Sequence, residues 1–359
     1  MMNSMQALTS DAEPPGSDPS NQYLVLFNKI NGTGRVQYYQ VDPGKLRRII
    51  PKSNHMTVPK LKEATGFSVV VLNNFLYVLG GRHLMSGAVL NQCLQFNPRV
   101  NQWLRRAPMR KARTRFTADA LDDWIFVAGG ELKNGKYSES VECYDPATDT
   151  WTEMKGMPKV RADHASCTAN GKLFVSGGLV GKKNVGSTSF WQYEPRTDYW
   201  IQATLRSQLP AERHKHMMIA HKDYIYCFGG LSLQPCGQQF LVQDDGSLLA
   251  FNINQLGDLD THLEGFWRTD LPSMTFPRSL AAVACIGHNI FLLGGHNYSK
   301  EKDADEVEYF NTKKEKWSSC FPIDQGPYTN MACGVICVPA TNREFSTMGV
   351  VMRNKWTLW

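Results

Sequence analysis

Residues 124–151 read WIFVAGGELKNGKYSESVECYDPATDTW, and this stretch decides the fold. It opens with an apolar run rich in aromatic and β-branched residues, which ends at Gly129-Gly130. A polar segment, a second such run and a Tyr-Asp-Pro turn lead to Trp151. Runs of this composition bounded by Gly, Asp and Pro are typical of β-strands joined by turns. The stretch therefore predicts strands at Trp124–Ala128 and Ser140–Tyr144, with another beginning at Trp151.

The same pattern recurs along the chain. Five Gly-Gly pairs each end an apolar run, and each is followed by an aromatic residue and then a tryptophan. A repeat of this kind indicates a repeat architecture more reliably than local propensity does. The pairs are Gly80-Gly81, Gly129-Gly130, Gly177-Gly178, Gly229-Gly230 and Gly294-Gly295, and the tryptophans are Trp103, Trp151, Trp200, Trp267 and Trp317.

Each unit contains four short strands. A four-stranded sheet cannot bury both of its faces alone, so such sheets stack radially as the blades of a propeller. We expect each tryptophan to fill the space between blades, and each glycine pair to adopt positive φ where a Cβ would clash. In the unit 113–154 the predicted strands are Arg113–Leu121, Trp124–Ala128, Ser140–Tyr144 and Trp151–Met154, with a turn at Asp122-Asp123.

The two ends of the chain supply one more blade. Tyr23–Phe27 and Arg35–Val41 read as strands that lack a first strand before them, and Met331–Val338 reads as a first strand with nothing after it. Joining them gives a sixth blade and removes the exposed edges of an open ring. The prediction is an all-β, six-bladed propeller over residues 21–340. Residues 1–20, rich in Pro, Ser, Asp and Glu, are expected to be a disordered leader, and residues 341–359 a C-terminal tail.

These features together resemble the kelch repeat. The resemblance rests on the doubled glycines, the Tyr-Asp-Pro-x-Thr-x-x-Trp turn and the Met-x-x-x-Arg segment at Met109–Arg113, Met157–Arg161 and Met274–Arg278. The phasing is most similar to that of kelch-like proteins, which carry BTB and BACK domains before the propeller. The resemblance implies a kelch β-propeller that binds another protein and does not catalyse a reaction.

Substrate recognition is the function that the resemblance implies. In full-length relatives such a propeller serves a cullin-RING (cullin three) ubiquitin ligase through the BTB and BACK domains. This sequence contains neither domain, so we expect contact with the ligase only through such domains elsewhere or through a partner chain. An actin- or cytoskeleton-binding scaffold is the alternative, because some kelch proteins bind actin.

The resemblance also implies where a partner would bind. Loops between blades and loops after the glycine pairs share one face and form a shallow central pocket. Guanidinium groups there suit a short acidic peptide, because they grip carboxylates bidentately. The alternative is that these residues are solvated loop ends. The expected pocket is Arg82, Arg115, Glu131, Asp163, Lys215, His296 and Asn330, within aligned sets that also contain Gly66, Leu280, Leu179 and Leu231.

Enzymes form the other class to weigh, because copper-radical oxidases and sugar mutarotases also use kelch-type propellers. Such a site needs clustered metal ligands or acid–base groups. His214 and His216 lie two residues apart on one face of a strand and His221 lies in the following turn, but no paired Tyr or Cys constellation accompanies them. P-loop, GxSxG, HExxH and Rossmann signatures are also missing from the sequence. We therefore expect no enzymatic activity, no metal and no cofactor.

Charge and cysteine content limit the remaining classes of function. The formal net charge of +6 is spread along the chain, so neither nucleic acid nor a membrane is expected as a partner. No run of about 18 apolar residues exists to span a bilayer. The nine cysteines include no CxxC pair, and Cys333 and Cys337 lack further zinc ligands nearby. We expect buried, reduced cysteines and a cytoplasmic location.

The fourth unit departs from the others by its length. Gly229 to Trp267 spans 38 residues in place of 22 or 23. The excess lengthens two loops, at Leu231–Ser247 and at Asn254–Gly265. Loops of this length are either functional or unstructured.

Overall fold

Regular structure in this protein is almost entirely β. The computed structural model describes residues 22–27, 35–42, 47–48, 54–57, 64–100, 102–181, 185–236, 239–255, 265–323 and 332–337. Within these ranges, two 3-10 turns, at Leu205–Ser207 and Ile253–Gln255, are the only helical segments. No helix of the described residues has the length and apolar character needed to cross a membrane. The all-β propeller predicted from the sequence is confirmed.

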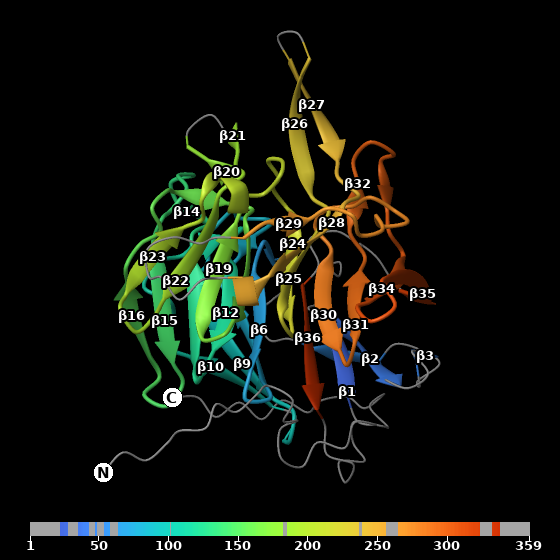
Figure 1. Cartoon of the computed structure of the whole chain (residues 1–359). Helices are drawn as coiled ribbons and strands as arrows, with labels where there is room; N and C mark the ends of the chain where they lie inside the picture. The colour runs from blue at the N-terminus through green and yellow to red at the C-terminus, as the bar shows by residue number, and fades with distance from the viewer. Residues whose placement is uncertain are drawn as a thin grey trace, which may run out of the picture.

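The described residues form six antiparallel sheets of four or five strands, which are the blades (Figure 1). The first contains β6 (Ser68–Leu72), β7 (Phe75–Leu79), β9 (Cys93–Asn97) and β10 (Gln102–Arg106); the second, β12 (Thr117–Leu121), β13 (Trp124–Ala128), β15 (Val141–Asp145) and β16 (Thr150–Met154); the third, β18 (Ala165–Ala169), β19 (Lys172–Ser176), β22 (Phe190–Glu194) and β23 (Tyr199–Gln202). The fourth contains β24 (Met217–His221), β25 (Tyr224–Phe228), β28 (Leu248–Asn252) and β29 (Trp267–Arg268); the fifth, β30 (Ala282–Ile286), β31 (Asn289–Leu293), β34 (Glu306–Asn311) and β35 (Lys316–Pro322).

The sixth blade combines the two ends of the chain. β36 (Ala332–Cys337) pairs with β1 (Gln22–Phe27) in antiparallel register, and β1 pairs with β2 (Arg35–Asp42). Two further strands that the sequence did not reveal, β3 (Arg47–Arg48) and β4 (Asn54–Thr57), pair with β2. The expected leader 1–20 and tail 341–359 lie outside the described residues.

The blades close into a ring around one axis. The innermost strands β6, β12, β18, β24, β30 and β36 contact one another in that order, and β36 contacts β6. Each hydrophobic cluster lies between two neighbouring blades. Val25 and Ile336 of the sixth blade pack with Leu76 of the first, and Val335 packs against the cluster of the fifth that contains Phe291. The core is therefore continuous across the two ends of the chain.

The glycine pairs lie where one blade meets the next. Gly129 and Gly130 have φ values of +65° and +94°, and the Gly130 N–H donates to the Arg161 carbonyl of the third blade at 2.9 Å. A Cβ on Gly129 would lie 2.8 Å from the Met157 side chain and 2.9 Å from the Arg161 carbonyl. Both proposed reasons for glycine, positive φ and close approach, are confirmed.

Four of the five recurrent tryptophans join their blade to the connection from the preceding one. Trp151 is 7% exposed and packs against Tyr144, with ring centroids 4.9 Å apart. Its indole Nε1 donates to the Ala107 carbonyl, 2.8 Å away, in the connection from the first blade. The same hydrogen bond joins Trp200 to Lys155, Trp267 to Ser207 and Trp317 to Pro272.

One arginine in each of four blades is buried at the end of the Met-x-x-x-Arg segment or its equivalent. Arg113 is fully buried and donates to the Gly129 carbonyl at 2.9 Å and to Glu142 Oε1 at 2.5 Å. Arg113 is thus a structural part of the repeat, as its sequence position suggested. The equivalents are Arg161, Arg213 and Arg278, and each donates to the carbonyl of the first glycine in its own blade.

Strand Arg113–Leu121, predicted as continuous, is in fact interrupted. β11 (Arg113–Thr114) ends before Arg115, whose φ is +58°, and β12 begins at Thr117. The prediction was wrong here because a left-handed residue other than glycine leaves no clear mark in the residue pattern. β11 instead pairs with β14 (Glu131–Leu132) in a small ribbon above the blade.

Other blades carry ribbons of the same kind. They are β5 (Ala64–Thr65) with β8 (Arg82–His83), β17 (Arg161–Ala162) with β20 (Leu179–Val180) and β21 (Val185–Gly186), and β32 (His296–Asn297) with β33 (Lys302–Asp303). β14, β20, β21 and β32 lie at the upper end of the ring in Figure 1, and we call this end the top face.

Candidate functional site

Five residues from successive blades follow one another around the axis at the top face and are linked by four backbone hydrogen bonds. Each stands just before its innermost strand, and each has a φ between +53° and +63°. From the second residue onward, the N–H donates to the carbonyl of the preceding one over 2.8 to 3.1 Å. This axial ring consists of Gly66, Arg115, Asp163, Lys215 and Leu280, five of the six positions that the repeat alignment had marked. The sixth, Asn330, lies outside the described residues.

The residues after the glycine pairs lie beside the axial ring. Arg82 pairs with Thr65, next to Gly66, and Glu131 pairs with Thr114, next to Arg115. Leu179, Leu231 and His296 stand in the same relation to Ala162, His214 and Ser279. The two sets of residues predicted from the sequence therefore lie next to each other around the axis at the top face, and we call the area that they surround the opening.

Four charged side chains on one side of this opening form a continuous network. Glu131 accepts hydrogen bonds from Arg82 Nη2 at 2.6 Å and from Arg115 Nη1 at 2.7 Å. Arg115 also binds both carboxylate oxygens of Asp163, with Nε to Oδ1 at 2.9 Å. Burial lowers the pKa of Arg115, but the bonds to Asp163 and Glu131 outweigh it and raise the pKa above the usual value. The network carries two positive and two negative charges, so it presents no net charge.

The opposite side of the opening has a different character. Lys215 Nζ donates to the Tyr298 hydroxyl at 3.2 Å and lies 5.1 Å from the centroid of its ring. His296 packs edge-on against the same ring, with centroids 4.5 Å apart, and its Nδ1 lies 2.6 Å from Asp303 Oδ1. Of the three cations predicted for the pocket, Lys215 has no carboxylate partner within the described residues.

A long hairpin of the fourth blade rises beside this cluster. β26 (Leu231–Cys236) pairs with β27 (Gln239–Asp244), so the described part of the expected loop Leu231–Ser247 is largely ordered as strands. Figure 1 shows the hairpin projecting beyond the other ribbons of the top face. At its base, Asp244 accepts hydrogen bonds from the backbone N–H groups of Tyr298 at 3.0 Å and Ser299 at 2.7 Å. The lengthened loop Asn254–Gly265 lies mostly outside the described residues.

Sequence reasoning missed Tyr298 and Asp244. Tyr298 is two residues beyond the predicted His296, and Asp244 lies in the loop whose length had been noted. Their contact joins residues 54 positions apart in different blades. The departure of the fourth unit from the repeat was the one signal in the sequence that pointed to this region.

The three histidines weighed as metal ligands have separate surroundings. His216 Nε2 lies 2.8 Å from Ser176 Oγ, whereas His221 Nδ1 lies 3.3 Å from Cys285 Sγ. The sequence predicted His221 in the turn, but it is the last residue of β24. Burial lowers the pKa of His214 to about 4. No group of three or more His, Cys, Asp or Glu residues suited to a metal occurs in the described part of the chain.

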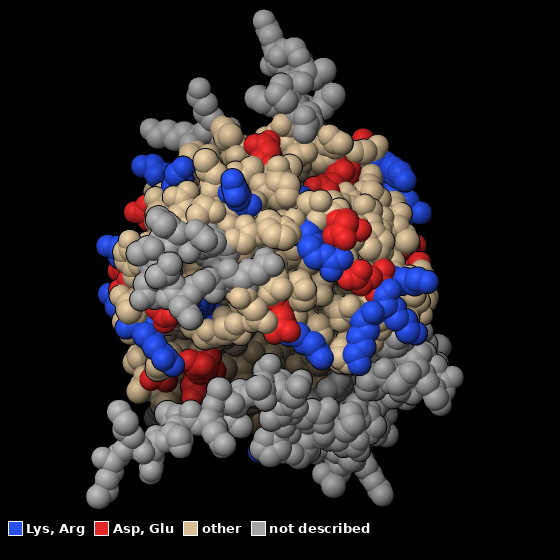
Figure 2. Space-filling model, in the orientation of Figure 1, with Lys and Arg blue, Asp and Glu red and all other residues tan. Residues whose placement is uncertain are grey.

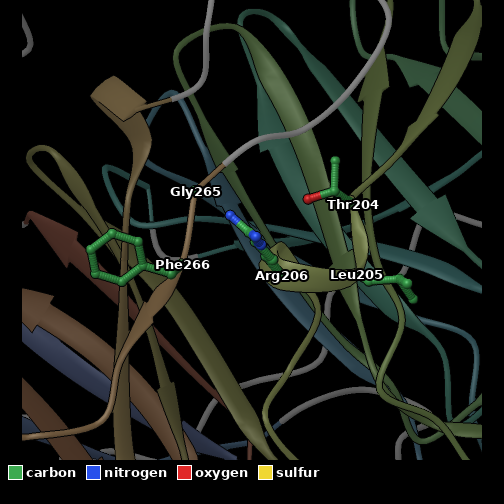
Figure 3. Close-up of a pocket in the computed structure, with 5 residues that line it drawn as sticks. All are labelled: Thr204, Leu205, Arg206, Gly265 and Phe266. Atoms are coloured by element: carbon green, nitrogen blue, oxygen red, sulfur yellow. The ribbon is translucent and has the colours of Figure 1, made fainter.

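A separate hollow of about 550 Å³ lies between the third and fourth blades (Figure 3). It is lined by Thr204, Leu205, Arg206, Gly265 and Phe266. Leu205 and Phe266 are 88% and 61% exposed. Arg206 is the one titratable side chain among these described lining residues, so they do not form an acid–base pair.

The side of the ring carries charges of both signs. Figure 2 shows basic and acidic side chains interspersed over the visible face, with no continuous basic stripe. Nucleic-acid-binding surfaces usually gather Lys and Arg on one face. The visible charge distribution gives no such footprint.

Comparisons with known families and proteins agree with the repeat pattern. The family model described as the KLHDC2/KLHL20/DRC7 Kelch-repeats domain matches residues 35–241, and the model described as the Kelch motif matches residues 277–320. Among solved structures, the one titled "Structure of YjhT" superposes with a TM-score of 0.59 at 16% identity, covering 74% of this chain and 86% of that one. At that identity the likeness concerns the fold alone.

Curated relatives match over most of this chain. Kelch-like protein 26 of Danio rerio is 28% identical over 302 residues, which are 80% of this chain and 46% of that protein. Kelch-like protein 36 of Bos taurus is 27% identical, over 70% of this chain and 38% of its own length. Beta-scruin of Limulus polyphemus is also 27% identical, over 68% and 26%. The chain thus spans less than half the length of these relatives.

Proposed function

Because this chain belongs to the kelch-repeat family of protein-binding propellers, we propose that its top face recognises a protein partner. The observation that carries the proposal is the convergence of the axial ring and the post-glycine residues, from five blades, around one opening. Loops held on a rigid scaffold are where binding residues concentrate. The proposed contact residues are Arg82, Arg115, Glu131, Asp163, Lys215 and His296, with Asn330 added by repeat alignment alone.

A short acidic peptide is the partner chemistry we propose. The opening carries three cations, and Lys or Arg groups at a partly desolvated site favour carboxylates. The side chains of Arg82 and Arg115 are each 31% exposed, so both can be reached from solvent. Binding, and not catalysis, is the role that this arrangement supports.

We propose further that the propeller is the substrate-recognition part of a cullin-RING ligase adaptor acting in the cytoplasm. The support is the similarity to Kelch-like proteins over most of this chain. The chain spans less than half of their length, so contact with the cullin requires BTB and BACK domains that are not in this sequence or that lie on a partner chain. Neither nucleic acid nor a membrane is proposed as a partner.

Proximity labelling in cells tests the partner proposal. The full chain fused to a labelling enzyme would be compared with an Arg82→Ala, Arg115→Ala, Lys215→Ala variant. We expect a defined set of proteins to be lost from the variant. A matched control, Arg196→Ala with Lys314→Ala, removes two exposed cations from turns between third and fourth strands, at the opposite end of the ring. If the control loses the same proteins, or the triple variant loses none, the top face is not the binding face.

Actin binding, the other partner class expected from the sequence, stays a prediction. Co-sedimentation of the purified chain with actin filaments tests it directly. Pelleting that the triple variant abolishes would make the top face a filament contact, and the acidic-peptide proposal would then be replaced.

A further inference from the structure

The three cations at the opening differ in what they can still bind. Both guanidinium groups, Arg82 and Arg115, bond to Glu131, and Arg115 is also bonded twice to Asp163. A carboxylate arriving from a partner would have to compete with ligands already in place. Charge-assisted pairs of this geometry are strong and well oriented. This side of the opening is therefore a poor binding site for an additional anion.

Lys215 is free of such competition. Its one side-chain hydrogen bond within the described residues goes to the Tyr298 hydroxyl, and an ammonium group has three donors. The phenol oxygen accepts that bond, so its own O–H remains available to donate. The two groups are 3.2 Å apart, so one carboxylate placed beside them can accept a hydrogen bond from each.

The position of Tyr298 is fixed from two directions. Asp244, at the base of the projecting hairpin, accepts from the N–H groups of Tyr298 and Ser299 and from the Ser299 hydroxyl. His296 packs edge-on against the phenol ring. Tyr298 is nevertheless 37% exposed, so it is held in place yet can be reached from solvent. Side chains that are ordered before binding lose little entropy when a ligand arrives.

An apolar neighbour completes the surroundings of Lys215. Leu280 is the next member of the axial ring, and its N–H donates to the Lys215 carbonyl at 3.1 Å. Leu280 is half-buried, so it can be reached from solvent next to Lys215. A carboxylate bound at Lys215 would thus lie beside an apolar contact.

We propose that Lys215 and Tyr298 form the carboxylate subsite of the top face, while the network from Arg82 to Asp163 is an electroneutral wall beside it. The subsite rests on the proposed function, since it specifies how the acidic peptide is held. It takes one peptide carboxylate, from an Asp or Glu side chain or from a chain terminus, next to an apolar residue. Recognition of the peptide charge then falls to a lysine and a tyrosine, and not to the two arginines.

Binding of degenerate peptides tests the subsite. Three fluorescent pools of nonapeptides, with flanks that are random apart from the exclusion of Asp and Glu, would be used: central Glu with an amidated terminus, central Gln with an amidated terminus, and central Gln with a free terminus. We expect the wild type to bind one carboxylate pool about tenfold more tightly than the Gln amide pool, the scale of one charge-assisted hydrogen bond. Whichever pool is preferred identifies the source of the carboxylate.

The variants decide which residues provide that preference. Lys215→Met should abolish the ratio between carboxylate and amide pools and Tyr298→Phe should reduce it, whereas the control Lys314→Met, at the opposite end of the ring, should leave it unchanged, all with wild-type melting temperatures. A ratio that survives Lys215→Met, or that falls further with Arg82→Met than with Lys215→Met, overturns the subsite while peptide binding stands. If the wild type binds none of the pools, the proposed function itself fails, and the subsite with it.

Discussion

Arg115 and Asp163, from neighbouring blades, are joined both by backbone and by side chain. The Asp163 N–H donates to the Arg115 carbonyl at 3.1 Å, and the Arg115 guanidinium grips both oxygens of the Asp163 carboxylate. The first bond belongs to the axial ring and the second to the charged network. One residue pair therefore links the closure of the ring to the shape of the opening.

Asp163→Asn should remove the ion pair and keep the fold. Asn tolerates the positive φ of this position, +53°, better than most residues, so the change isolates the charge. The carboxylate is 7% exposed, and we expect a loss of roughly 1 to 3 kcal/mol in the free energy of unfolding, measured by urea denaturation. Asp163→Ala should cost more, because it adds backbone strain. Equal stability of wild type and Asp163→Asn would show that the ion pair between Arg115 and Asp163 does not contribute to the free energy of unfolding.

Trp151→Ala should cost about 3 to 5 kcal/mol, because it empties the space between the first and second blades. Trp151→Phe should cost less, since it keeps much of the ring and loses the hydrogen bond to Ala107. Trp124 is 43% exposed and serves as the control, with an expected cost within about 0.5 kcal/mol on change to Ala. Similar losses of unfolding free energy at both tryptophans would argue against the role of Trp151 in filling the space between blades.

Glu142→Gln should destabilise the protein strongly, by about 3 to 5 kcal/mol, because it leaves the guanidinium of Arg113 buried without its carboxylate. Glu153→Gln breaks an exposed pair with Lys111 in the same blade and should cost about 1 kcal/mol or less. Thermal or chemical unfolding of the two variants compares them directly. The prediction fails if the two costs are the same.

Arg161, the equivalent of Arg113 in the third blade, has no carboxylate partner among the described residues. It is fully buried like Arg113, but its side-chain bonds go to the Gly177 carbonyl and the Ser189 hydroxyl. Burial lowers its pKa to about 10. Trp191 occupies the position that Glu142 holds in the second blade. The third blade therefore tolerates a buried guanidinium without a carboxylate, and we expect it to be the more easily unfolded of the two blades by amide hydrogen exchange.

Asp119 should make stability depend on pH. Burial raises its pKa to about 6, partly offset by a hydrogen bond from Ser166. A carboxyl group whose pKa is higher in the folded state stabilises the fold while protonated, so this contribution is lost as the pH rises through 6. The advantage of Asp119→Asn over wild type should grow by ~1 kcal/mol between pH 5 and pH 8. A difference that is constant, or that shrinks, would contradict the assignment.

The sequence predicted those features that depend on residue type at a fixed spacing. The glycine pairs, the tryptophans and the chain-end strands all follow from the repeat, because each blade must meet its neighbour in the same way. The convergence of Arg82, Glu131, Arg115 and Asp163 on one opening followed from the same alignment, although their pairing into a neutral network did not. Pairing depends on side-chain reach between blades, which the spacing of residues along the chain does not encode.

Features that no residue type marks could not be predicted in this way. Positive φ occurs before four of the innermost strands at residues other than glycine, so the residue type did not indicate that the strand is interrupted there. These residues are Arg115, Asp163, Lys215 and Leu280. Tyr298 gains its place from Asp244 in another blade. Both depend on tertiary contacts between distant segments, and both lie at the proposed binding face.

Ring closure across the chain ends is the claim on which the opening depends, because the axial ring needs all its blades around one axis. Engineered cysteines test it: Leu24 lies opposite Val335 in the register of β1 and β36, whereas Ala332 is three positions away. Mild oxidation of Leu24→Cys, Val335→Cys should give a disulfide, identified by peptide mass among the native thiols, and Leu24→Cys, Ala332→Cys should not. No cross-link in the first variant, or equal yields in both, would contradict the closed ring.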